Sequence, residues 1–177
     1  MPPAVAGPVV RPMRLSEVGY RIDYFLDASD EYLRLLGVER AQLPSRADWL
    51  ADYERAFALP IAERPSYILA WELDDELVGF STADPFTFGD EAFMHLHIRL
   101  PDRRRTGLGV EFVRRSADAY FETLELRRLL CQPNAFNVAP NRTLQAAGFR
   151  YVHTEVCRPH PMNFEQPITR WALDRPR

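Results

Sequence analysis

The feature that most constrains this chain is a glycine-rich turn between a strand and a helix. Its residues are Arg104, Arg105, Thr106, Gly107, Leu108 and Gly109. The turn follows an alternating apolar segment at residues 92–100 and precedes a helical pattern at residues 109–124. Glycines let a backbone bend closely around a ligand, and the first amides of a helix have no partner within the helix. The arginines add positive charge, so the sequence predicts a phosphate site at this turn.

A second motif lies closer to the carboxyl end. It begins at Asn137, passes through a short helical pattern at residues 140–147 and ends with Gly148 and Phe149. The glycine is in the position of a helix C-cap, and the phenylalanine begins the next predicted strand. Neither GxGxxG nor GxxxxGK[ST] occurs in the chain, so the common nucleotide-binding loops are excluded.

Together, the two motifs resemble those of the GNAT N-acetyltransferase superfamily, nearest to the branch that contains ribosomal-protein N-terminal acetyltransferases. The turn is similar to the acetyl-CoA pyrophosphate loop of that family, which implies acetyl-CoA as cosubstrate. The resemblance assigns the pantetheine arm to Asn137, with Asn134 as the alternative. It also implies that main-chain amides near Arg99 and Leu100 polarise the thioester carbonyl, at a strand that separates from its neighbour.

Hydrophobic patterning predicts the order β-αα-β-β-β-α-β-α-β-β. The expected helices are residues 16–36, with a break near 28–30, then 45–59, 109–124 and 140–147. The expected strands are residues 9–15, 66–73, 76–82, 92–100, 128–131, 149–157 and 168–173. This order matches the GNAT fold, an α+β fold in which helices flank a mixed, mostly antiparallel central sheet. We expect residues 1–177 to form a single acyl-CoA N-acyltransferase domain, with residues 1–8 as a flexible tail.

Two histidines are the candidate catalytic residues. His95, His97 and Arg99 alternate along the strand before the turn, so all three side chains face the same side of the sheet. Histidine is the natural base near neutral pH, and either imidazole can remove a proton from the attacking amine. The alternative is a structural histidine pair that is hydrogen-bonded across the sheet. No third ligand stands beside the pair, so no metal site is predicted.

The chain departs from the family pattern where many relatives carry an acid for the leaving thiolate. The matching positions hold Leu144 and Pro140, which have no proton to donate. A thiol with a pKa of about 8.5 can leave unassisted, or Tyr151, Tyr120 or His153 can replace the missing acid. Cys131 lies inside an apolar strand and is interpreted as a core thiol rather than a nucleophile.

The acceptor is expected to be a small-molecule or peptide amine. In the family, its site lies between the first helices and a late hairpin loop, which here are residues 20–37 and 158–167. The acidic residues in the first segment favour a cationic amine, and Tyr24 and Trp49 add aromatic walls; these acids are Asp23, Asp27, Asp30 and Glu31. A homodimer is left open.

Composition excludes several other classes of protein. The net charge is −3, so neither a nucleic-acid partner nor an anionic membrane partner is expected. All 22 basic residues are arginine, which excludes a catalytic lysine. The amino-terminal residues resemble neither a signal peptide nor a membrane span, so a cytoplasmic location is expected.

The resulting hypothesis is an N-acetyltransferase that moves an acetyl or short acyl group to a primary amine by direct attack in a ternary complex. The alternative is a CoA-binding sensor or interaction module with a degenerate catalytic centre, which the residues at positions 140 and 144 favour. A third interpretation is that the turn binds a different phosphate ligand or a structural anion.

Overall fold

The computed structural model describes residues 7–99 and 107–176. Within them, seven strands form one mixed sheet in the order β1-β2-β3-β4-β5-β7-β6. Neighbouring strands are antiparallel except β4 and β5, which run parallel. The strands are β1 (Val9–Pro12), β2 (Tyr67–Leu73), β3 (Glu76–Phe86), β4 (Glu91–Ile98), β5 (Arg128–Cys131), β6 (Arg150–Cys157) and β7 (Gln166–Asp174).

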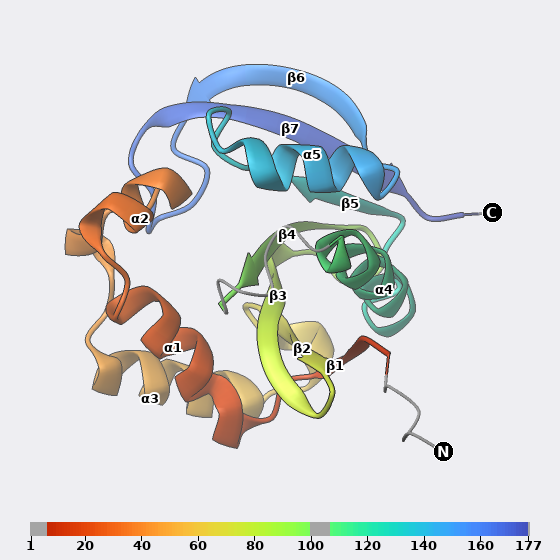
Figure 1. Ribbon diagram of the computed structural model, residues 1–177. Coiled ribbons are helices and arrows are strands. Elements are labelled where there is room, and N and C mark those ends of the chain that lie inside the picture. Colours follow the sequence, from red (N-terminus) through yellow and green to blue (C-terminus); the bar gives the residue numbers. More distant parts are fainter. Residues whose placement is uncertain (1–6, 100–106, 177) are drawn as a thin grey trace, which may run out of the picture.

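Helices cover both faces of this sheet (Figure 1). One group packs on one face: α1 (Val18–Leu26), α2 (Asp30–Leu36) and α3 (Arg46–Phe57). The other face carries α4 (Leu108–Thr123) and α5 (Val138–Ala146). Short 3-10 turns occur at Leu15–Glu17, Arg40–Gln42 and Ile61–Glu63. Among the described residues, no helix has the length and apolarity required to cross a bilayer.

The predicted element order is confirmed, and local sequence explains most of the boundaries. The long amino-terminal helical stretch breaks where Ser29 caps α2, its hydroxyl accepting from the Tyr32 amide at 3.1 Å. Ser45 caps α3 in the same way. Asp74 and Asp75 both adopt positive φ in the turn between β2 and β3, as two-residue hairpins require. The first strand ends at Pro12, earlier than the pattern predicted, although the Met13 amide still donates to the Ile68 carbonyl at 3.0 Å.

Two hydrophobic cores lie on the two faces of the sheet. The larger core packs α4 and α5 against the sheet, and the fully buried Trp71 stacks on Phe112 with ring centroids 4.9 Å apart. The smaller core packs α1, α2 and α3 around Phe25 and Phe80. The catalytic candidates on β4 face the smaller core, because His97 contacts both of these rings.

The sheet opens between the parallel strands β4 and β5, which pair only over a short length. Its register contains three pairs, Glu91 with Arg128, Ala92 with Leu129 and Phe93 with Leu130. Beyond Phe93, strand β4 continues to Ile98, whereas β5 ends at Cys131 and the chain leaves through Pro133. The two strands therefore separate, as the family resemblance implied, and beyond Phe93 no strand of the described residues pairs with the edge of β4 that faces β5.

Candidate functional site

A cavity occupies the place where β4 and β5 separate, and we call it the splay cavity. Residues 94–97 of β4 form one wall, and residues 131–134 at the end of β5 form the other. Asn137 and Pro140 contribute from the start of α5, and Pro159 and Asn163 from the loop between β6 and β7. The cavity therefore gathers side chains from segments that lie far apart in the sequence.

The edge of β4 supplies main-chain donors to this cavity. The Arg99 amide donates to the Val78 carbonyl at 2.9 Å, which shows that the amides of odd-numbered residues in this segment point toward β3. Because amides alternate along a strand, those of Met94 and Leu96 point away from β3. Met94 lies next to Phe93 and Leu130, the last register pair with β5, so the Leu96 amide is the one that faces the gap. The predicted use of the Arg99 amide is not supported, since that amide is paired with β3. Leu100 lies outside the described residues.

The Arg99 side chain also has partners on the helical face. Its guanidinium lies 4.7 Å from the centroid of the Tyr20 ring and donates to the Tyr20 carbonyl at 3.1 Å. This is the same face on which His95 and His97 stand, as the alternation predicted. The side chain thus joins β4 to α1.

The two asparagines after β5 have different surroundings. The Asn134 amide nitrogen donates to Gln166 at 2.8 Å, and its oxygen accepts from the Phe136 amide at 2.9 Å. Asn137 lines the cavity, and its side chain makes no hydrogen bond within the described part of the chain. The structure therefore leaves the Asn137 side chain available to a ligand and commits that of Asn134 to the loop.

The predicted phosphate turn is described from Gly107 onward, and Arg104, Arg105 and Thr106 lie outside the described residues. Gly107 is the N-cap of α4 with φ of +81°, a conformation that favours glycine. The helix begins beside the end of β4, since a Cβ on Gly109 would lie 3.7 Å from the Ile98 side chain. The first amides of α4, including those of Leu108 and Gly109, lack partners inside the helix, so an anion fits there.

His95 is held in one tautomer. Its Nε2 lies 2.7 Å from the Asp84 carbonyl oxygen, and because that oxygen only accepts, Nε2 must carry the proton. The neutral ring then has a free lone pair on Nδ1, which has no hydrogen-bond partner among the described residues. Burial lowers the pKa of His95 below its ordinary 6.5, so the ring is neutral at pH 7. A positioned neutral imidazole is a proton acceptor.

His97 has a different environment. Its Nδ1 lies 3.1 Å from the Tyr24 hydroxyl, which in turn lies 2.8 Å from that of Tyr32. The ring is surrounded by the side chains of Tyr24, Phe25 and Phe80, with centroids within 5.2 Å. His97 also lines the splay cavity, so both predicted histidines reach it.

No conventional acid for the leaving thiolate stands in the cavity wall. Leu144 is fully buried in the larger core, and Pro140 has no proton to donate. Of the replacements considered, Tyr120 is buried against Ser81, with its pKa raised by burial, whereas Tyr151 and His153 lie on the exposed strand β6. None of these three lines the splay cavity. Cys131 does, but it is only 1% exposed, and burial raises the pKa of its thiol.

A second hollow, the α3 cleft, lies on the helical side of His95. Its walls come from α1, α3, Asp84 at the end of β3, and His160 and Met162 in the loop between β6 and β7. Asp84 and His160 link this cleft to His95. The Asp84 carboxylate lies 3.2 Å from His160 Nε2, and the ring centroids of His160 and His95 are 5.7 Å apart. The two hollows have no lining residue in common, but His95 of the splay cavity and His160 of the α3 cleft are in contact.

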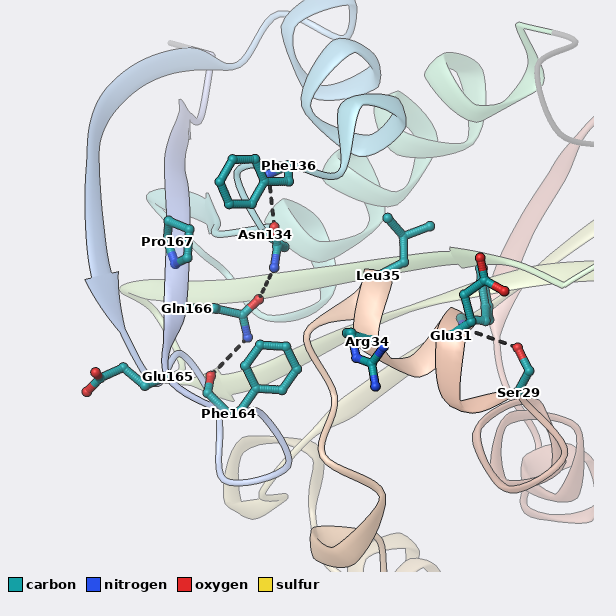
Figure 2. A pocket seen from close by; sticks show the side chains of 11 residues that line it. Ser29, Glu31, Arg34, Leu35, Asn134, Phe136, Phe164, Glu165, Gln166 and Pro167 are labelled. Carbon is teal, nitrogen blue, oxygen red and sulfur yellow. Dashed lines mark hydrogen bonds between the residues drawn. The ribbon is translucent and has the colours of Figure 1, made fainter.

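A third hollow, the α2 groove, lies between α2 and residues 164–167 (Figure 2). Figure 2 shows Asn134, Gln166 and the Phe164 carbonyl joined by hydrogen bonds along its wall. Gln166 also donates to the Gly37 carbonyl at 2.9 Å, so this network fastens the end of α2 to β7. Both segments that were expected to enclose the acceptor thus line hollows.

The acids expected to form the acceptor wall do not form one surface. Asp23 pairs with Arg46 at 3.0 Å, and Asp30 forms an ion pair with Arg40 on the outside of the molecule. Glu31 does line the α2 groove. Sequence reasoning missed Asp84 as a wall residue, because no motif marks it, whereas His160 lies in the loop at residues 158–167 that was expected to enclose the acceptor. Among the described residues, no group of three or more metal-ligating side chains is found.

Comparisons with known proteins agree with this geometry. A family model for the acetyltransferase (GNAT) domain matches residues 10–150. No curated protein sequence matches the chain significantly. Among solved structures, the aminoglycoside acetyltransferase AAC(6′)-Ib in complex with coenzyme A has 16% identity and a TM-score of 0.71, with 96% of this chain and 95% of that chain covered.

Two further structures have the same fold. The ribosomal-protein acetyltransferase RimL has 12% identity, a TM-score of 0.74, and coverage of 97% of this chain and 96% of that chain. A spermidine N-acetyltransferase from Vibrio cholerae, in complex with CoA and spermine, has 15% identity, a TM-score of 0.73, and coverage of 94% and 95%. The family model spans most of the chain and the fold agrees, so this protein belongs to the GNAT acetyltransferase family and is an acetyl-CoA-dependent N-acetyltransferase.

Proposed function

We propose that this enzyme acetylates the primary amine of a small molecule or peptide, with its chemistry at the splay cavity and His95 as the base. The observation that carries the proposal is the separation of β4 from β5 beside a neutral, positioned imidazole. An acetyl thioester supplies a carbonyl carbon that an amine can attack. The residues around the cavity supply what such an attack requires.

The residues fit an acetyl-CoA ligand along the edge of β4. The Leu96 amide points into the gap and can donate to a carbonyl or amide oxygen, as a neighbouring strand would. Asn137 offers an uncommitted side-chain amide on the opposite wall. The first amides of α4, with Arg104, Arg105 and Thr106 before them, are proposed to hold the pyrophosphate.

His95 is proposed to accept the proton of the attacking amine at Nδ1. The Asp84 carbonyl keeps the other ring nitrogen protonated, so the base has a fixed orientation. His97 is proposed as the second imidazole of the site, a positioning residue held by the Tyr24 hydroxyl. The leaving thiolate is proposed to take its proton from water, because the cavity wall offers neither of the family's usual acids.

The decisive experiment measures thiol release from acetyl-CoA with a panel of amines. Purified protein is incubated with acetyl-CoA and, in turn, an aminoglycoside, spermidine, free amino acids and a peptide with a free amino terminus. We expect amine-dependent thiol release for at least one class of amine, and a loss of about 100-fold or more in His95→Gln. Binding of acetyl-CoA without release of thiol by any amine would favour the sensor alternative instead.

A further inference from the structure

Arg21 is a buried arginine that has no acidic partner among the described residues. It lies on α1 and is 6% exposed, yet within the described residues it forms no ion pair. One of its terminal nitrogens donates to the Tyr53 hydroxyl at 2.5 Å, and its Nε is buried with no hydrogen-bond partner. A charge that is buried without a counterion is costly, so such an arrangement needs a compensating interaction.

Aromatic rings provide part of that compensation. The guanidinium carbon lies 5.2 Å from the ring centroids of Phe25 and Trp49, 5.8 Å from that of Phe80 and 5.9 Å from that of Tyr53. Rings stabilise the charge, but they do not satisfy the directional donors of a guanidinium, which match a carboxylate. The aromatic rings therefore hold the guanidinium in place but leave some of its N–H donors without an acceptor.

Arg21 lines the α3 cleft, and so does one ionised carboxylate near it. Burial would raise the pKa of Asp84, but the hydrogen bond from His160 and the positive charge of Arg21 hold it below its ordinary value. At the rim, Arg55 and Asp52 form an ion pair with each other. The inner cleft thus presents a cation on α1 and an anion beside His95, with apolar walls from Trp49 and Met162.

We propose that the acceptor is a free amino acid, which carries an amine and a carboxylate a few bonds apart. Its carboxylate pairs with Arg21, and its amine is directed toward Nδ1 of His95, the ring nitrogen that the Asp84 carbonyl leaves unprotonated. This inference rests on the proposed function, and it replaces the simple cationic amine that the acidic helix residues suggested. The apolar walls favour an amino acid with an apolar side chain.

The first test compares matched acceptors with the wild-type enzyme. L-phenylalanine is assayed beside 2-phenylethylamine and L-phenylalaninamide, and L-leucine beside 3-methylbutylamine and L-leucinamide. The decarboxylated amine and the carboxamide both remove the negative charge, but they shift the basicity of the amine in opposite directions. We expect the amino acid to have the higher kcat/KM in each set, by about 10- to 100-fold.

The second test uses Arg21→Gln and Arg21→Lys, with Arg115→Gln as the control, because Arg115 pairs with Glu111 on the surface of α4 and does not line the α3 cleft. Arg21→Gln is expected to lower kcat/KM for the amino acids by about 10- to 100-fold, mainly through KM, and to leave the decarboxylated amines unchanged. Arg21→Lys keeps the positive charge among the aromatic rings, so its kcat/KM for the amino acids is expected to lie between those of the wild type and Arg21→Gln. Arg115→Gln is expected to match the wild type.

Each outcome is informative. Equal kcat/KM for acids and decarboxylated amines, or a better turnover of spermidine, overturns the inference while leaving the acetyltransferase intact. An equal loss for both acceptor types in both Arg21 variants assigns Arg21 to the core and also overturns it. If no amine releases thiol, the proposed function fails instead. If Arg21→Gln does not fold, the Arg21→Lys variant decides between these results.

Discussion

At the scale of single residues, His95 shows what a sequence pattern could and could not provide. Alternation along the strand placed His95, His97 and Arg99 on one face, and the contacts with the helical layer confirm that placement. The tautomer of His95 depends on the Asp84 carbonyl, which reaches the ring where the register of β3 shifts between Ala83 and Phe86. Such a shift depends on the packing of the sheet, so the sequence pattern could not predict it.

The role of His95 gives a pH dependence with a definite sign. The base works in its neutral form, and burial lowers its pKa below 6.5, so the limb of the kcat/KM profile that His95 contributes should lie below that pH, with the rate lost as the pH falls. In His95→Gln, this acidic limb should disappear along with most of the rate. The measurement is a pH profile of kcat/KM with a saturating amount of acetyl-CoA.

The matched control is His153→Gln, because His153 is an exposed histidine on β6 that pairs with Glu155. It should keep both the rate and the acidic limb of the wild type. If His95→Gln retains the limb, the titrating group is another residue, and the assignment of the base is refuted.

Gly37 gives a residue-scale prediction about stability. It ends α2 with φ of +75°, and an added Cβ would lie 1.9 Å from the Gln166 side chain. Gly89 has nearly the same φ, +76°, with nothing within 4 Å of the corresponding position. We expect Gly37→Ala to lower the free energy of unfolding by about 2–3 kcal/mol and Gly89→Ala by about 1 kcal/mol.

Urea denaturation of the two variants measures this difference. Equal losses would mean that the Gln166 side chain moves aside, so that only the backbone conformation matters. A larger loss in Gly37→Ala would confirm that Gln166 holds the end of α2 in place.

At the scale of elements, the order and type of the helices and strands followed from the hydrophobic periodicity of the sequence, whereas the residues at which they end depended on tertiary contacts. The pattern predicted β5 at residues 128–131, as observed, because a short apolar run between an Arg pair and Pro133 has sharp limits. Strand β3 runs four residues beyond its predicted end, to Phe86, because β4 continues to pair with it there. The choice between Asn134 and Asn137 likewise required Gln166, which is distant in sequence.

The start of α4 carries a prediction for ligand binding. Acetyl-CoA at 100 times its dissociation constant should stabilise the wild type by about 2.7 kcal/mol, which raises Tm by about 5–10 °C. In Gly107→Trp, the bulky ring at the N-cap should block the helix amides, so the shift should fall close to zero. Thermal unfolding with and without acetyl-CoA, for each protein separately, removes any effect of the substitution on stability itself.

Free CoA and Gly89→Trp complete this experiment. Free CoA should stabilise the wild type as well, because the pyrophosphate is present without the acetyl group. Gly89 lies in another turn with similar φ, so Gly89→Trp should keep the full shift. An unchanged shift in Gly107→Trp would place the cofactor elsewhere.

At the scale of the whole molecule, one sheet carries a core on each face, and this arrangement supports the predicted single domain. The two cores share strands β2 and β3: alternate residues of β2 enter opposite cores, and β3 contributes Val78 and Ala83 to the larger core and Phe80 to the smaller one. We therefore expect thermal unfolding in a single transition, with calorimetric and van't Hoff enthalpies that agree. Two resolved transitions would show that the cores unfold separately. The homodimer and the cytoplasmic location stay predictions.

The short pairing between β4 and β5 has a consequence for how this enzyme can change over evolutionary time. The sheet divides there into a part built entirely from residues 9–98 and a part built from residues 128–174, and the backbone ladder between them has three register pairs. A ligand lying along the exposed edge of β4 would extend that ladder across the seam. Mutations that raise the affinity for the ligand would then also stabilise the junction between the two parts of the sheet. Ligand affinity and folding stability of this enzyme would therefore tend to be selected together.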